Sequence, residues 1–425
     1  LALAVFFRRI DVMGPENLPR EGGVLFVSNH LNAFVDAMLL RAVLPRPLWL
    51  TAKDTLRQNP LMRVLLRATR TITVQRREDQ QGTAGNRDTV ARLAALLAGG
   101  EQVAIFPEGF SHSEGRLRPF KSGAARIALQ AAKSCDTVAV VPVGLVYLQK
   151  STFRSDVVVR FGSPIGVAKL PADLRDPHVL TERFARDVTA LAVPISPERS
   201  KFIHWAAELA LAGGAPPMRL GQRRDNYLPR YMRMLERISS AYDRLPPQQV
   251  ADVQRRMLAL YDLTGGARLN VAEIYLPLTW WRIAIFVIRE LEVLLVAGPI
   301  ALFGYVNHVP AYFGTRAIVR RLAKDEDHVA TDAIFFGFPW FALCYAAQTA
   351  AIATFLGRGA AACYAIALPY TGAVTLLFRD RTLDARRRLS SFAALISNRT
   401  RREKIQEEAQ ALVDDVNHLL AEVQR

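Results

Sequence analysis

Residues 24–36 read VLFVSNHLNAFVD. A short apolar run gives way to polar residues, and Asn32 then precedes a second run with helical composition over 33–40. This order predicts a strand, a turn and a helix, with His30 after the strand and Asp36 near the start of the helix. The positive end of the helix dipole would keep Asp36 ionised and let its carboxylate hold the His30 imidazole in one tautomer. An imidazole held in this way can act as a general base.

His30 and Asp36 alone also fit a plainer interpretation, as a hydrogen-bonded turn histidine and an ordinary acid of a first helical turn. The choice depends on a second stretch with the same organisation, residues 105–129, which read IFPEGFSHSEGRLRPFKSGAARIAL. A strand is predicted over 102–106, followed by a turn at the Pro-Glu-Gly of 107–109 and, after a polar loop, a helix.

Lys121 lies just before this second helix, whose expected N-cap is Ser122. The free N–H groups and the dipole of a helix N-terminus favour an anion, and the lysine ammonium adds to them. The pattern therefore predicts a phosphate site. A solvent-exposed lysine and, at Glu108, a turn carboxylate are the plainer alternatives.

Together the two stretches resemble the glycerolipid acyltransferase family, which includes glycerol-3-phosphate and lysophosphatidic acid acyltransferases. The first motif of that family joins Asn-His to a later Asp, and its third motif, Phe-Pro-Glu-Gly, stands intact at residues 106–109. The second and fourth motifs resemble ITVQR at 72–76 and VPV at 141–143. The resemblance covers about residues 10–170, and it implies an α/β catalytic domain.

Two features depart from the family pattern. His30 and Asp36 have five residues between them instead of four, so the helix must begin one residue later or the turn must bulge. This longer spacing resembles the yeast-type glycerol-3-phosphate acyltransferases, with their HxNxFVD run. Ser111 stands where the family often has an arginine. Phosphate binding is then expected of neighbouring basic side chains: Arg76, Arg77, Arg118 or Lys121.

The resemblance implies direct acyl transfer with His30 and Asp36 as the catalytic pair. His30 would deprotonate an acceptor hydroxyl, which attacks the thioester of acyl-CoA or acyl carrier protein, and no covalent intermediate, cofactor or metal is expected. Arg76 and Lys121 would hold the phosphate of the acceptor. The full set of expected substrate-binding residues is Arg76, Glu108, Gly109 and Lys121.

The acceptor stays open between glycerol 3-phosphate and lysophosphatidic acid, and the longer motif spacing favours the first. Alternatives are another lysolipid acceptor or an inactive, membrane-anchored lipid-binding protein. The net charge of +16 implies an anionic partner, but charge alone does not choose among lipid, phosphorylated substrate and nucleic acid. No nucleic acid is expected from the motifs. The three cysteines have no metal-like spacing and indicate a reducing compartment.

Strands and helices alternate along the first part of the chain, which argues for an α/β layer fold. Residues 10–23 are expected to be a turn-rich approach to the first strand. The predicted strands are 24–27, 48–52, 71–74, 102–106, 138–146 and 157–161, and the predicted helices include 33–40, 60–66 and 88–97. The predicted domains are an acyltransferase α/β domain (1–200), a helical basic connection (201–275), a membrane-embedded helical region (276–378) and a basic cytoplasmic tail (379–425).

Residues 333–356 and 359–378 are apolar, carry no charged side chain and are long enough to span a membrane, so a hairpin over 333–378 is predicted. The stretch 291–313 holds prolines and His308, and is expected to be a kinked span, a re-entrant pair or an interfacial helix. The basic tail places the protein in the cytoplasmic membrane with its catalytic domain facing the cytoplasm. An amphipathic helix over 403–423 is expected to serve self-association or docking on the catalytic domain.

Overall fold

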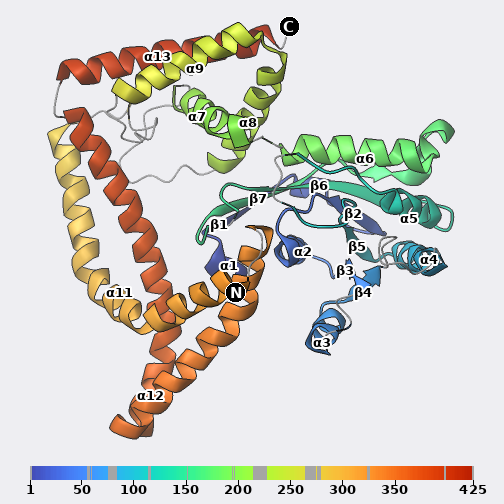
Figure 1. Ribbon diagram of the computed structural model, residues 1–425, viewed down its shortest axis with the longest axis horizontal. Coiled ribbons are helices and arrows are strands. Elements are labelled where there is room, and N and C mark those ends of the chain that lie inside the picture. Colours follow the sequence, from blue (N-terminus) through green and yellow to red (C-terminus); the bar gives the residue numbers. More distant parts are fainter. Residues whose placement is uncertain are drawn as a thin grey trace. The chain divides into compact units, whose positions relative to one another are not determined.

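The computed structural model describes residues 2–54, 58, 60–74, 84–112, 116–150, 152–193, 195, 197–213, 227–263, 274, 279–322, 326–396 and 399–423. Contacts within the chain divide it into two compact units. The first comprises Leu1–Ser196 and Arg321–Phe335, and the second comprises Pro197–Arg320 and Phe336–Arg425. The first unit is built around a β-sheet, whereas the second is helical (Figure 1).

The described residues of the first unit form an eight-stranded mixed sheet in the order β1-β7-β6-β2-β5-β3-β4, with β8 beside β6. Strands β6, β2, β5, β3 and β4 are mutually parallel, and β7 runs antiparallel to β6. All the strands expected from the sequence form within one residue of their expected ends. The strands are β1 (Arg9–Met13), β2 (Val24–Ser28), β3 (Leu48–Lys53), β4 (Thr71–Val74), β5 (Gln102–Ile105), β6 (Ala139–Tyr147), β7 (Asp156–Phe161) and β8 (Ile165–Gly166).

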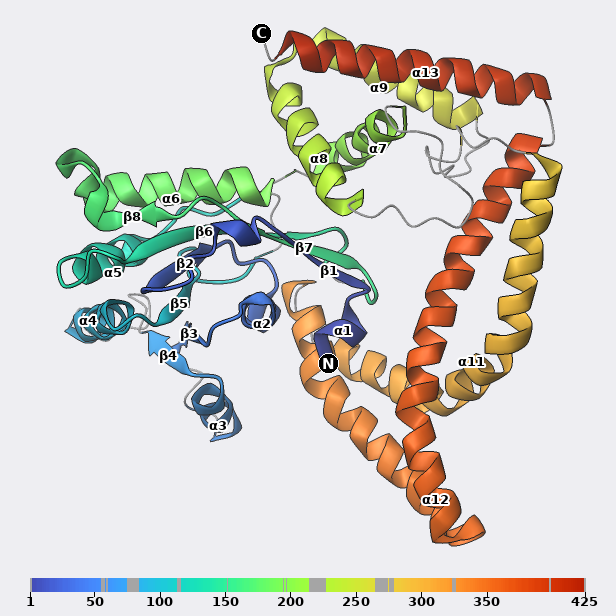
Figure 2. The same cartoon turned by 180° about the vertical axis from the view of Figure 1, so that it is seen from behind.

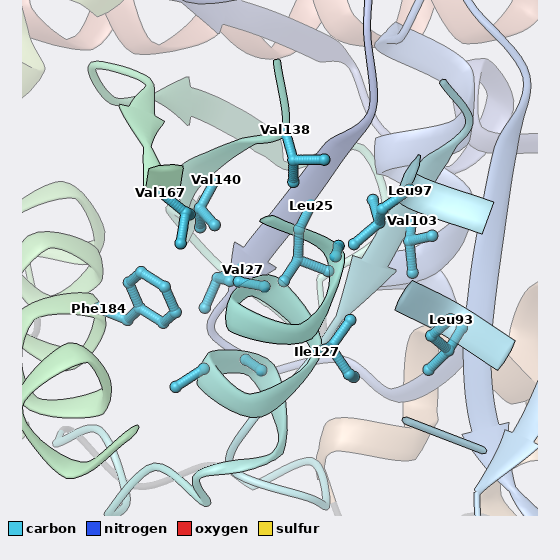
Figure 3. Close-up of a cluster of buried hydrophobic side chains, with 14 of the residues drawn as sticks. Leu25, Val27, Leu93, Leu97, Val103, Ile127, Val138, Val140, Val167 and Phe184 are labelled. Atoms are coloured by element: carbon cyan, nitrogen blue, oxygen red, sulfur yellow. The ribbon is translucent and has the colours of Figure 1, made fainter. Parts of the chain in front are cut away.

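Helices cover both faces of the sheet, as Figures 1 and 2 show from opposite sides. Leu25 and Val27 of β2 pack toward α4 (Ala84–Ala98), α5 (Gly123–Ala132) and α6 (Pro177–Ala192), forming the cluster of Figure 3. Val24 and Phe26 point to the other face, against α2 (Ala33–Val43). Every residue of β2 is buried, because a central strand with helices on both faces has no solvent side. A short helix, α3 (Pro60–Ala68), connects β3 to β4.

The expectation of a turn-rich approach over residues 10–23 is wrong at its start. Arg9–Met13 forms the edge strand β1, which pairs in parallel with β7. Ile10 and Val12 point to the same face and pack on two apolar clusters. The strand is short, half-buried and carries two charges among its five residues, so its apolar alternation is weak in the sequence.

A third apolar cluster joins distant parts of the chain within the first unit. It brings α1 (Ala2–Phe6) and α2 together with Val157 and Ala330. Ala330 is fully buried, and the neighbouring Thr331 hydroxyl donates a hydrogen bond of 3.3 Å to the carbonyl oxygen of Asn32. Residues 321–335, which lie between two long apolar stretches, are thereby part of the unit that carries the sheet.

The second unit contains α7 (Pro197–Gly213), α8 (Tyr227–Arg244), α9 (Pro247–Leu263) and α13 (Arg399–Glu422). The apolar stripe of α13 is buried against α7 and α9, and Arg256 forms an ion pair with Asp415. The stripe therefore packs within its own unit, and the expected self-association or docking on the catalytic domain stays a prediction.

Two long helices make up the rest of the second unit, α11 (Trp280–Leu322) and the part of α12 (Glu326–Ile396) from Phe336 onward. Gly357 has non-helical backbone angles, φ 86° and ψ 170°, and divides α12 into two arms. This confirms the tight turn expected there. α11 is one continuous helix with Pro299 and Pro310 inside it.

α11 packs closely on both arms of α12. A Cβ atom at Gly304 would lie 2.5 Å from the Thr371 carbonyl oxygen, so this close approach requires glycine. His308 Nε2 lies 2.5 Å from the Tyr345 hydroxyl, and the Tyr364 hydroxyl donates to Asn307 Oδ1 at 2.5 Å. The polar side chains of the stretch 291–313 therefore bind neighbouring helices.

Within the described residues, one helical stretch, His328–Arg386, is long and apolar enough to cross a membrane by length and composition. Only 17% of its most apolar window is buried inside the protein. Large apolar side chains on its outer surface include Phe338, Leu343, Phe355, Leu356, Ile366 and Leu377.

Candidate active site

His30 and Asp36, the predicted catalytic pair, are in contact at the junction of β2 and α2. His30 Nδ1 lies 2.8 Å from Asp36 Oδ2, and the Asp36 side chain is fully buried. The His30 side chain is 17% exposed and stacks on Phe106, with ring centroids 4.4 Å apart. Among the described residues His30 Nε2 has no hydrogen-bond partner. This nitrogen is therefore available to take a proton while Nδ1 is held by the carboxylate.

The turn between the two residues absorbs the extra position in the motif. Ala33, the first residue of α2, has φ 41°, a left-handed conformation that costs about 1 kcal/mol for a residue with a Cβ. Asp36 offsets this strain, because its Oδ2 accepts hydrogen bonds of 2.8 Å from the backbone N–H groups of Leu31 and Asn32. The helix begins at the expected residue, and the turn before it is distorted so that the carboxylate reaches the ring.

Asn29, the residue before His30, fixes the end of β2 to the neighbouring strand. Its side-chain amide donates to the Leu145 carbonyl oxygen at 3.0 Å, and its Oδ1 accepts from the Leu145 N–H at 2.7 Å. The side chain is completely buried. A two-bond contact of this kind holds the backbone of His30 against β6, so the Asn of the Asn-His pair has a structural task.

Tyr147 also reaches the carboxylate, and sequence reasoning missed it. It is the last residue of β6, and its hydroxyl donates a hydrogen bond to Asp36 Oδ1. Burial, together with the charge of Asp36, raises the pKa of the Tyr147 phenol well above its usual range. The hydroxyl therefore stays protonated and remains a donor. The available signal was a tyrosine at the end of a buried apolar strand beside the motif.

Glu108 of the second stretch lies beneath the His30 turn and is fully buried. Its Oε1 accepts the His30 N–H at 2.7 Å, and its Oε2 accepts the Arg118 N–H at 2.9 Å. The ring of His112 also bonds Oε2, and the His112 N–H donates to the His30 carbonyl at 3.2 Å. Both carboxylate oxygens are therefore engaged in joining the two motifs, and this geometry favours a positioning role for Glu108.

Gly109 and Lys121, both predicted to bind substrate, lie against each other. Gly109 has φ 86°, and a Cβ added to it would lie 3.1 Å from Lys121 Nζ. The Lys121 N–H donates to the Pro107 carbonyl at 2.9 Å. Ser122 occupies the N-cap position of α5 as predicted, but its side chain makes no capping hydrogen bond. Lys121 thus lies just before α5, and its ammonium lies beside Gly109, so that phosphate binding there stays a prediction.

The parallel strands bring these groups to one edge of the sheet. His30 follows β2 and Glu108 follows β5, and these strands pair in parallel with Val27 opposite Ile105. Lys53 ends β3 at the same edge, a cation that sequence reasoning left out. Ligands of open α/β sheets bind at this carboxyl edge. Arg76 and Arg77 lie outside the described residues, so their predicted contact with phosphate stays a prediction.

The described residues contain no group of three or more His, Cys, Asp or Glu side chains that is placed to hold a metal ion. His30 is instead surrounded by a buried hydrogen-bond network whose acceptors are the carboxylates of Asp36 and Glu108. Such a network is suited to proton transfer at the one imidazole nitrogen that it leaves open.

Comparison with known proteins finds similarity in the first unit. Residues 9–146 match the acyltransferase family. The 1-acyl-sn-glycerol-3-phosphate acyltransferase of Borreliella burgdorferi is 26% identical over 151 residues, which are 36% of this chain and 58% of that protein. The glycerol-3-phosphate O-acyltransferase 2 of Saccharomyces cerevisiae is 49% identical over 67 residues, 15% of this chain and 9% of that protein.

A solved structure, the 1-acyl-sn-glycerophosphate acyltransferase PlsC of Thermotoga maritima, aligns with a TM-score of 0.35 and 20% identity, covering 46% of this chain and 76% of that one. The chain therefore spans 58% of the length of the Borreliella burgdorferi protein and 9% of the length of the yeast protein.

Proposed function

We propose that the protein is a membrane-bound O-acyltransferase of phospholipid biosynthesis, and the match of residues 9–146 to the acyltransferase family supports this proposal. It moves a fatty acyl group from acyl-CoA or acyl carrier protein to a hydroxyl of glycerol 3-phosphate or lysophosphatidic acid. The observation that carries the proposal is the His30–Asp36 pair, 2.8 Å apart and bound through the His30 backbone to Glu108.

In the proposed reaction, His30 Nε2 takes the proton of the acceptor hydroxyl as the oxygen attacks the thioester carbonyl. Asp36 stabilises the imidazolium that forms, and a backbone N–H or a basic side chain stabilises the oxyanion. The C–S bond then breaks, and the thiolate takes the proton from His30. One ester bond forms and one thioester bond is lost, so the protein returns to its starting state. The acyl donor is a co-substrate, and no resident cofactor or metal takes part in these steps.

The proposed phosphate site consists of Lys121, the N-terminus of α5 and Arg76. Replacing Lys121 by glutamine should raise KM for a phosphorylated acceptor about tenfold and change kcat little, because the lost contact is made in the ground state and the transition state alike. Lys133→Gln is the matched control, since Lys133 is exposed at the other end of α5. Steady-state kinetics with varied acceptor measure the effect. An unchanged KM would contradict the site.

We also propose that α11 and both arms of α12 are embedded in the membrane. The outer surface of this helical part carries large apolar side chains, and its polar side chains bond one another inside. The arginines after Phe378 favour a cytoplasmic side for that end, and the catalytic unit is proposed to face the cytoplasm. The protein is expected to stay with membranes washed in alkaline carbonate and to be released by detergent. Release by carbonate alone would contradict this part of the proposal.

The acceptor is tested with purified protein in detergent, given labelled acyl-CoA and, in parallel, glycerol 3-phosphate or lysophosphatidic acid. The longer motif spacing and the 49% identity to a yeast glycerol-3-phosphate acyltransferase over 67 residues favour glycerol 3-phosphate as the better acceptor. Transfer only to lysophosphatidic acid would reverse that choice and keep the reaction. If neither is acylated, with acyl-CoA or with acyl carrier protein as donor, other lysolipids follow. Failure with all of them would contradict the proposed activity.

A further inference from the structure

We propose that Tyr147 is a positioning residue of this reaction, because its hydroxyl fixes the Asp36 carboxylate in the orientation that holds His30. The inference rests on the proposed acyl transfer and adds to it a residue that lies outside the recognised motifs.

The argument begins with how Asp36 divides its two oxygens. Oδ2 accepts from the N–H groups of Leu31 and Asn32 and lies 2.8 Å from His30 Nδ1. Oδ1 bonds the Tyr147 hydroxyl, the single donor to that oxygen among the described residues. Three contacts on one oxygen and one on the other define a unique orientation of the carboxylate. Without Tyr147 the carboxylate has nothing to hold Oδ1, and it gains freedom to rotate away from the imidazole.

Tyr147 is itself held rigidly. It is the last residue of β6, the strand that pairs in parallel with β2, and its ring centroid lies 5.9 Å from that of Phe7. Leu145, two residues earlier, carries the paired hydrogen bonds to Asn29. Strand β6 therefore holds both the backbone at Asn29, through Leu145, and the Asp36 carboxylate, through Tyr147. This arrangement is the kind of supporting contact that keeps a catalytic pair in its working geometry.

The test is Tyr147→Phe, which keeps the ring and deletes the hydroxyl. We expect kcat to fall about tenfold or more, the loss of one hydrogen bond to a charged group, with KM for both substrates within about twofold. Tyr231→Phe is the matched control. Tyr231 is a buried tyrosine on α8 whose hydroxyl lies 2.5 Å from His204 Nδ1. Its replacement should leave kcat unchanged.

A second measurement does not depend on activity. The proton on His30 Nδ1, assigned by its absence in His30→Gln, should give a downfield NMR signal in the wild type, because the Asp36 carboxylate binds it. This signal should weaken or disappear in Tyr147→Phe, where the carboxylate is free to rotate away. An unchanged kcat or an unchanged Nδ1 proton signal would overturn the role of Tyr147, while an inactive His30→Ala would keep the proposed function intact. A wild type that acylates no acceptor would instead overturn the proposed function, and the proton signal would still decide whether Tyr147 acts on the pair.

Discussion

Replacing His30 by alanine should lower kcat/KM for acyl transfer by about 10³-fold, within the range that general base catalysis contributes. The variant removes the imidazole whose Nδ1 is held by Asp36 and whose Nε2 is open to a hydroxyl. The His30 backbone bond to Glu108 is kept, because alanine retains the N–H group. Folding should therefore be preserved. The measurement is ester formation from labelled acyl-CoA, together with the circular dichroism melting curve.

His418→Ala is the matched control for this substitution. The His418 side chain is 73% exposed on α13 and lies 3.6 Å from Glu422, so it belongs to a solvated pair in the second unit. Its loss should leave the rate within about twofold, as expected for a surface ion pair. Should His30→Ala keep more than a tenth of wild-type kcat/KM, the general-base role of His30 would be wrong.

Replacing Glu108 by glutamine should impair both stability and catalysis. Glutamine has the size of glutamate, but its NH₂ group would face one of the donors that the carboxylate now accepts: the N–H groups of His30 and Arg118 and the ring of His112. A buried, mismatched donor pair costs about 1–3 kcal/mol, and more where a charge is lost. Since one of these donors is the N–H of His30, the proposed general base, kcat should fall about 10²-fold. Thermal unfolding and steady-state kinetics measure the two effects.

Glu182→Gln, at an exposed position on α6, is the control for the loss of a carboxylate and should change neither quantity measurably. The Glu108 variant also separates two roles for this residue. If Glu108 contacts an acceptor hydroxyl, as the motif resemblance implies, its replacement should raise KM for the acceptor and leave the melting temperature unchanged. That pattern would contradict the positioning role that its burial favours.

Local patterns in the sequence predicted the strands and the contact of His30 with Asp36, because each depends on neighbours along the chain. β2 is apolar up to its last residue, Ser28, and the following helix brings Asp36 back toward His30 within one turn. The left-handed backbone of Ala33 was beyond such reasoning. This conformation accompanies the hydrogen bonds that the Asp36 carboxylate accepts from the turn. Alanine rarely adopts a left-handed conformation, so the residue type at position 33 does not predict it.

Contacts between distant residues account for most of what the sequence left out. Tyr147 is 111 positions from Asp36, and the two meet only because β6 pairs with β2. Thr331 bonds the Asn32 carbonyl across 299 positions. Glu108 was predicted as a site residue from its motif, but its burial depends on the turn at His30 and the loop at Arg118, which both donate to its carboxylate. Ser122 was placed correctly, yet its φ of −70° and ψ of 4° are not the extended conformation in which a cap side chain folds back onto the helix.

Single-turnover mixing of the purified protein with labelled acyl-CoA tests the central claim most directly, that His30 drives direct transfer from donor to acceptor. Without acceptor, no label should become bound to the protein. With acceptor, ester should form at the rate at which CoA is released, and His30→Ala should form neither product at a comparable rate. Label that accumulates covalently on the protein before ester appears, or ester formed equally by the wild type and His30→Ala, would contradict the account.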